Sequence, residues 1–226
     1  MSAEEAPRQR AQQERSVRTR EAILVAAGEA FEERGYAAAT LQMIMEKAGV
    51  TKGALYHHFK SKEEMVRELL AQQVPMSTLP PQDSKIQESI DTSFFFVHLL
   101  QTHPLARAGA RLSTDGGLPP EVDGRGPFMS WAEHAECLLT QARASGQMLP
   151  NVTPREAAEA IVGSFIGIQL TSKAISDRED LPRRISVLWQ AILPGIAAPG
   201  LLPGLDFAPD RMARIEIANP PSTEEN

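Results

Sequence analysis

The stretch TLQMIMEKAGVTKGALYHHFKSKEE, residues 40–64, decides the fold of this 226-residue chain. Thr40 and Thr51 belong to the residue types that cap helix N-termini, and apolar residues at helical spacing follow each of them. Between them, Gly49 has the conformational freedom to end the first helix in a left-handed turn. The stretch therefore predicts two short helices joined by a tight turn, which is the pattern of a helix-turn-helix.

Helical patterns continue on both sides of this pair. A first helix is predicted from about Arg18 to Arg34, with Gly35 directly after it. Its apolar positions recur at helical spacing and should form its buried face: Ile23, Ala26, Ala27, Ala30 and Phe31. A fourth helix begins at Ser61, because Glu64 three residues later completes a capping box. Long alternating runs of β-branched residues are missing, so the fold class is predicted as all-α.

The second of the two short helices exposes residues suited to DNA. Leu55 and Phe59, four residues apart, should face inward, which turns the polar side chains outward. The candidate DNA-binding residues, with both caps included, are Thr40, Thr51, Lys52, Gly53, Ala54, Tyr56, His57, His58 and Lys60. Lys52 can donate to guanine acceptors in the major groove, and the others suit phosphate oxygens or permit a close approach. Two alternatives stay open: Tyr56 packs against the first helix, or the two histidines form an ordinary surface pair.

The run Thr51–Glu63, with Phe31, Gly35-Tyr36 and Thr40-Leu41 before it, resembles the N-terminal domain of the TetR family of repressors. The resemblance covers about residues 19–70. It implies a three-helix DNA-binding domain that docks on double-stranded operator DNA as one half of a homodimer, with one recognition helix in each major groove of a pseudo-palindrome. It also implies DNA contacts at the candidate residues other than Ala54. His57 stands where many family members carry Tyr or Phe.

Charge is distributed unevenly along the chain. The net charge is −6, yet residues 8–20 hold five arginines and one acid, and residues 47–62 hold four lysines and no acid. The first 70 residues are neutral overall, so the acidic excess lies in the remainder. Basic segments on an acidic body favour an oriented approach to DNA, although ordinary solvated helix faces would look the same.

The composition predicts a cytoplasmic protein that associates with the nucleoid when it binds DNA. A single cysteine, Cys137, cannot form an internal disulfide, which fits a reducing compartment. The N-terminus lacks the apolar region of a signal peptide, and no apolar run has membrane-spanning length, so no membrane partner is expected.

A second helical domain is predicted after a Pro-rich stretch at 79–84. Its helices are expected at about Lys85–Thr102, Leu105–Leu112, Phe128–Ser145, Pro154–Ser176 and Leu181–Ile196. The predicted organisation is a disordered basic arm at 1–16, a helix-turn-helix domain at 17–74, a regulatory ligand-binding and dimerisation domain at 75–197, and a loosely wrapped or disordered Pro-rich tail at 198–226.

The helix expected at 154–176 is apolar nearly all round, which is typical of a helix buried on both sides. One side would line a cavity, and the other would meet a partner subunit, where Gly163 and Gly167 permit close helix approach. The candidate dimerisation residues are Gly163, Gly167, Leu170 and Leu188. Core packing within a single chain is the alternative.

Trp131 is one of two tryptophans, and its large apolar ring with one N–H suits an amphiphilic ligand, although many tryptophans only fill a core. The segments Ala108–Leu112, Pro127–Trp131 and Gly163–Gly167 are similar to the γ-butyrolactone receptor branch of the TetR family. This resemblance implies an actinomycete repressor of secondary metabolism, released from DNA by a diffusible autoregulator of γ-butyrolactone, butenolide or furan type. The candidate ligand-binding residues are Trp131, Gln73, Ser164, Phe165 and Ile168.

Two other functions compete with this one. His134 and Cys137 share a helix face, but a lone His/Cys pair is a weak metal or thiol site, and no catalytic or nucleotide-binding motif occurs. The sequence therefore predicts that the chain is not an enzyme and uses no metal or cofactor. The second rival is a DNA-binding dimer that responds to another small molecule or to a protein partner. A lined apolar cavity at Trp131 would favour a ligand, and a filled one would favour a protein partner.

Overall fold

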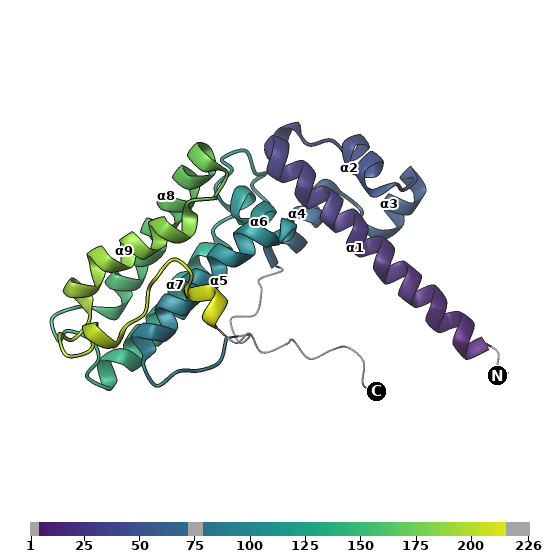
Figure 1. Ribbon diagram of the computed structural model, residues 1–226. Coiled ribbons are helices and arrows are strands. Elements are labelled where there is room, and N and C mark those ends of the chain that lie inside the picture. The colour runs from purple at the N-terminus through teal and green to yellow at the C-terminus, as the bar shows by residue number, and fades with distance from the viewer. Residues whose placement is uncertain (1–4, 72–78, 216–226) are drawn as a thin grey trace. The chain divides into compact units, whose positions relative to one another are not determined.

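The structure is a computed structural model that describes residues 5–71 and 79–215. Within these ranges the chain forms nine α-helices, two short 3-10 helices and no β-strand (Figure 1). The prediction of an all-α fold is confirmed.

The chain divides into two compact units. Residues 1–73 and 104–127 form the first unit, and residues 74–103 and 128–226 form the second. The first unit contains α1 (Glu5–Ala38), α2 (Leu41–Ala48), α3 (Lys52–His58), α4 (Lys62–Ala71) and α6 (Pro104–Ser113). The second contains α5 (Lys85–Thr102), α7 (Gly126–Ala144), α8 (Pro154–Ser176), α9 (Leu181–Ile196), η2 (Leu202–Gly204) and η3 (Arg211–Arg214).

The core of the first unit is built from one face of each helix. The five apolar positions predicted for the first helix are all buried, and Leu55 and Phe59 of the α3 segment are fully buried beside them. Ile44 of α2 and Met65 of α4 complete the centre of this core. Because the apolar side of α3 is held inside, its polar side is turned outward.

Both predicted caps of the helix-turn-helix are present. Thr40 Oγ1 accepts a hydrogen bond from the Met43 N–H at 3.2 Å, and Thr51 Oγ1 accepts one from the Ala54 N–H at 3.3 Å. Gly49 ends α2 in a left-handed conformation, with φ at 65°. The turn between the two short helices therefore follows the local chemistry of its residues.

The first helix is longer at both ends than predicted. It begins at Glu5, so residues 5–16 of the expected disordered arm are helical. This segment is rich in Glu, Gln, Arg and Ala, which are good helix formers, and its proline lies in the first turn, where a missing N–H costs nothing. At the other end, the backbone turns at Gly35, with φ at 72°, and resumes a helical course to Ala38.

One predicted domain assignment is corrected. Residues 104–127 were expected in the regulatory domain but pack with the first unit. Ala108 and Leu112 of α6 are fully buried in the same core as α1 and α4, and Arg107 pairs with Glu32 of α1 at 2.9 Å. The small and large apolar residues of α6 suit packing against another helix. The sequence alone does not say which helix that is.

The second unit is built around α5 and α9. Leu181, Ile185, Trp189 and Leu193 follow at steps of four along α9 and are all buried. The Trp189 indole N–H donates to Ser93 Oγ of α5 at 2.7 Å. After α9, residues 198–215 pack back onto α5, which corrects the prediction of a loose tail for this part of it.

Candidate nucleic-acid interface and an apolar cavity

The outward side of α3 carries the residues expected to contact DNA. Seven of the nine candidates are exposed, namely Thr40, Thr51, Lys52, Gly53, Tyr56, His57 and Lys60, whereas Ala54 and His58 are half-buried. The Tyr56 side chain is 45 % exposed, and its ring lies 6.0 Å from Lys52 Nζ. This exposure argues against the alternative in which Tyr56 packs into the first helix.

The two histidines differ in their surroundings. Their rings are 5.0 Å apart in an edge-to-face arrangement. Burial, together with the nearby charges of His57 and Arg20, lowers the pKa of His58. His58 is therefore neutral at physiological pH and can offer a ring N–H without bringing a charge.

Only part of the basic segment at 47–62 is free to meet phosphates. Lys47 pairs with Glu33 at 2.8 Å, and Lys62 Nζ donates to the carbonyls of Tyr36 and Ala39 at 2.7 and 3.0 Å. Burial lowers the pKa of Lys62, whose ammonium lies 4.0 Å from the Tyr36 ring centre. Across the described ranges, Lys52 and Lys60 have no ion-pair partner. These two lysines supply the positive charge of the α3 surface.

Lys62 is part of a polar cluster with Tyr36 and Glu63 that the sequence did not reveal. The Tyr36 hydroxyl donates to Glu63 Oε1 at 2.5 Å. Burial and this carboxylate raise the pKa of Tyr36 to about 12, and the hydrogen bond from Tyr36 is the main reason why the pKa of Glu63 falls to about 2. This cluster links the end of α1 to the start of α4, and so it helps to fix the two helices between which α2 and α3 are held.

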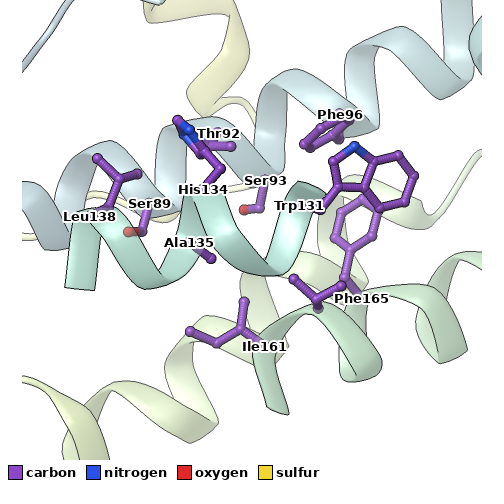
Figure 2. A pocket seen from close by; sticks show the side chains of 11 residues that line it. Ser89, Thr92, Ser93, Phe96, Trp131, His134, Ala135, Leu138, Ile161 and Phe165 are labelled. Atoms are coloured by element: carbon purple, nitrogen blue, oxygen red, sulfur yellow. The ribbon is translucent and has the colours of Figure 1, made fainter. Parts of the chain in front are cut away.

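The second unit contains an apolar cavity at Trp131. It is lined by residues of α5, α7 and α8, namely Ser89, Thr92, Ser93, Phe96, Trp131, His134, Ala135, Leu138, Ile161, Val162 and Phe165, and has a free volume of about 50 Å³. Three aromatic rings gather at one end (Figure 2). The Phe96 ring lies 5.0 Å from Trp131 and 6.2 Å from Phe165, centre to centre.

The polar groups of the cavity are few. Ser89, Thr92 and Ser93 each donate their hydroxyl proton to a backbone carbonyl of α5, at 3.0, 2.8 and 2.6 Å. They can therefore only accept from a ligand. His134 also lines the cavity (Figure 2), and burial lowers its pKa. Its neutral imidazole has no hydrogen-bond partner in the part of the chain that the structure describes.

The predicted ligand residues divide into three groups. Trp131 and Phe165 line the cavity. Ser164 is exposed and Ile168 is half-buried, and neither lines this cavity. Gln73 lies outside the described residues. Helix register explains the position of Ser164, because Ile161 and Phe165, one turn apart, face the cavity and Ser164 is rotated away from them. Ile168 is on nearly the same face as Ile161 but lies two turns farther along α8.

The contribution of α5 was missed, although its spacing was a usable signal. Ser89, Thr92, Ser93 and Phe96 stand at i, i+3, i+4 and i+7 and make one helix face. Three of these four are hydroxyl residues, which blurred the apolar pattern on which the prediction relied.

The predicted dimerisation residues lie on α8 and α9. Gly163, Gly167 and Leu170 are exposed on one side of α8, and Leu188 of α9 is half-buried. In a single chain this side of α8 is therefore open, whereas the opposite side is buried at Ile161 and Phe165.

Residues 5–71 and 79–215 contain no group of three or more His, Cys, Asp or Glu side chains placed to hold a metal ion, and Cys137 is exposed. Within the same ranges, no helix combines the length and the apolar character needed to span a membrane.

Comparison with known proteins gives matches to both parts of the chain. Residues 23–69 match the family model of bacterial regulatory proteins of the tetR family, and residues 83–198 match the tetracyclin repressor-like C-terminal domain. The A-factor receptor protein of Streptomyces griseus is 36% identical over 192 residues, which cover 85% of this chain and 68% of that protein.

Solved structures show the same fold. Full-length native tylp, a TetR regulator from Streptomyces fradiae, superposes with a TM-score of 0.79 at 34% identity, over 89% of this chain and 97% of that one. A gamma-butyrolactone receptor described as an ArpA-like protein gives a TM-score of 0.71 at 27% identity, over 88% of this chain and 98% of that one. The chain belongs to the TetR family of bacterial transcriptional regulators, which are not enzymes.

Proposed function

We propose that this regulator is a repressor that binds a pseudo-palindromic operator as a homodimer and is released by a small amphiphilic autoregulator of the γ-butyrolactone, butenolide or furan type. Thr40, Thr51, Lys52, Tyr56 and Lys60 of the α2–α3 surface would contact the operator. The autoregulator would enter the cavity at Trp131. The regulated genes would belong to secondary metabolism, as the resemblance to the γ-butyrolactone receptor branch implies.

The observation that carries this proposal is the cavity walled by Phe96, Trp131 and Phe165. Aromatic rings bind the apolar part of a ligand, and His134 with the hydroxyl oxygens offers a small polar end. An amphiphile that lacks a charge fits this lining best. The lining residues include no Lys or Arg that could neutralise the carboxylate of a charged ligand.

The free volume favours a second candidate function. A cavity of about 50 Å³ is smaller than the roughly 300 Å³ or more typical of sites for drug-sized ligands. An autoregulator must therefore displace lining side chains as it binds. A regulator that responds to a much smaller molecule or to a protein partner would need no such displacement.

Release requires that the autoregulator bind the DNA-incompetent state more tightly than the competent one. Couplings of this kind typically amount to about 1–3 kcal/mol. Helix α5 is suited to transmit the difference, because it lines the cavity and is joined to α6 of the first unit through His103 alone. Helix α4 is a second route, because the chain enters the second unit directly after it.

The test is an operator-release assay with DNA from upstream of the protein's own gene and a synthetic γ-butyrolactone that carries a medium-length alkyl chain. We expect wild type to release the DNA as the lactone is added. Trp131→Ala should bind the DNA normally but require more lactone. Met129→Ala is the matched control, since Met129 is exposed on the same helix and does not line the cavity.

Three outcomes decide between the candidates. Release of wild type and Met129→Ala with a blunted response of Trp131→Ala supports the proposal. Equal release of all three proteins contradicts the cavity as the lactone site. If wild type is not released by this lactone, nor by an alkyl butenolide and an alkyl furan added in the same assay, the autoregulator class is contradicted and the second candidate function is left.

A further inference from the structure

Residues 198–215, here called the C-terminal strap, run from the end of α9 back to α5. Figure 1 draws the strap in yellow-green to yellow, with η3 against α5. The family match ends at residue 198, the first residue of the strap, so the rest of the strap lies beyond the match.

A buried ion pair fastens the strap. Asp91 of α5 has a side chain that is only 1 % exposed, and Arg211 of the strap grips it with two hydrogen bonds, Nε to Oδ1 at 2.7 Å and Nη2 to Oδ2 at 2.8 Å. The side chains of Gln82 and Gln87 donate to the same carboxylate. All its oxygens are thus occupied by donors, as a buried carboxylate requires.

A second attachment lies one helical turn away. The Gln87 amide donates to the Asp206 carbonyl at 2.8 Å and accepts from the Asp206 backbone N–H at 2.8 Å. The strap therefore holds α5 at two successive positions on one side, Gln87 and Asp91.

The opposite side of the same helical turns lines the cavity. At 3.6 residues per turn, Ser89, Thr92, Ser93 and Phe96 are centred about half a turn around the helix from Gln87 and Asp91. Ser93 is also held by the Trp189 indole. Rotation or sliding of α5 would move the cavity wall, and it would break the two-bond grip on Asp91 at the same time.

We infer that Arg211 is a positioning residue for the cavity: by gripping Asp91, the C-terminal strap fixes the rotation of α5 and so sets the shape of the wall against Trp131. Burying a charge pair adds little net stability, because desolvation offsets the attraction, but it disfavours every position of α5 that leaves a charge unpaired. The part that concerns the autoregulator rests on the function proposed above.

The test compares three variants by fluorine NMR of protein labelled with fluorotryptophan, in which Trp131 and Trp189 give separate signals. Arg211→Leu removes the grip. Arg214→Leu is the matched control, because Arg214 is in the same strap but pairs with Asp206 and Asp210 instead of α5. The double variant Asp91→Leu/Arg211→Leu removes both charges, so the strap is loosened without leaving an uncompensated buried carboxylate.

We expect the Trp131 signal to shift and broaden in Arg211→Leu and in the double variant, and to stay at its wild-type position in Arg214→Leu. The double variant should regain most of the melting temperature that Arg211→Leu loses. It therefore carries the test if the single variant folds poorly. A wild-type Trp131 signal in the double variant would overturn the inference and reduce the ion pair to a stabilising contact.

Titration with the alkyl γ-butyrolactone separates this inference from the proposed function. Where wild type binds the lactone, the double variant should bind it about five- to tenfold more weakly, and Arg214→Leu should bind as wild type does. Equal affinities would overturn the inference. If wild type does not bind the lactone, the autoregulator proposal fails, whereas the fluorine signals still decide the role of the strap.

Discussion

Lys60 and Lys62 stand two residues apart, and their surroundings give them opposite roles. The Lys60 side chain is exposed and meets no acid in the described ranges, so its charge is available to a phosphate. The Lys62 ammonium is held by two backbone carbonyls at the end of α1. A count of basic residues treats the two alike, but only the first should act on DNA.

This contrast gives a paired prediction. Lys60→Ala should reduce the slope of log affinity against log salt by about one, because one phosphate contact is lost, and should leave the melting temperature unchanged. Lys62→Met should do the reverse: it should keep the slope and cost about 1–3 kcal/mol of unfolding free energy, because two part-buried carbonyls lose their donor. Fluorescence anisotropy of labelled operator DNA at several salt concentrations, with thermal denaturation alongside, measures both quantities. A changed salt slope in Lys62→Met, or an unchanged one in Lys60→Ala, would contradict the assignment.

At the scale of the element, the course of α1 depends on Gly35. Its φ of 72° is unfavourable for residues with a side chain, and a Cβ there would lie 2.9 Å from Asp115 Oδ2. That carboxylate accepts the Tyr36 N–H at 2.8 Å. Burial opposes its ionisation, but hydrogen bonds from the Tyr36 and Gly117 N–H groups and the charge of Arg111 lower its pKa overall. A side chain at residue 35 would therefore strain the backbone and force the Asp115 carboxylate to move.

Gly35→Ala should lower the free energy of unfolding by more than the roughly 1–2 kcal/mol expected for a left-handed alanine alone. Gly49→Ala is the matched control, since its φ is 65° in the same unit and a Cβ there would meet nothing within 4 Å. Chemical denaturation of both variants measures the difference. Equal losses would show that the Asp115 contact adds nothing to the backbone strain.

The sequence predicts most elements because their ends are marked by local chemistry. The caps at Thr40 and Thr51 and the glycine turn at residue 49 act within a few residues, and the structure reproduces them. The sequence does not predict which distant segment packs against a given helix face. The burial of Lys62 depends on the end of α1, and the cavity face of α5 depends on α7 and α8. Such pairings are set by packing between distant segments, which local patterns do not encode.

At the scale of the whole molecule, the chain passes between its two units three times, before α5, after α5 and at the start of α7. Among the helices in residues 5–71 and 79–215, α5 is the only one whose two ends both lead into the first unit. It also forms a wall of the cavity and bears the grip of Arg211. We therefore expect a displacement of α5 by a bound molecule to reach α6 through the backbone itself, and we expect the strap to limit how far α5 can move.

We propose that the chain dimerises through the open side of α8, and this proposal can be tested there. Gly163, Gly167 and Leu170 share this side, and Leu170 is 40 % exposed in the single chain. Leu170→Glu should convert the dimer to a monomer and abolish operator binding, because a buried unpaired charge at the interface costs several kcal/mol. Ile175→Glu is the matched control on the same helix: Ile175 is 68 % exposed but points about a third of a turn away from the centre of that side, so this variant should stay dimeric and bind DNA. Sedimentation velocity gives the oligomeric state, and anisotropy gives the affinity for the operator. A dimeric Leu170→Glu protein would place the interface elsewhere, whereas a monomeric Ile175→Glu protein would show that the interface extends around α8 beyond the glycine side.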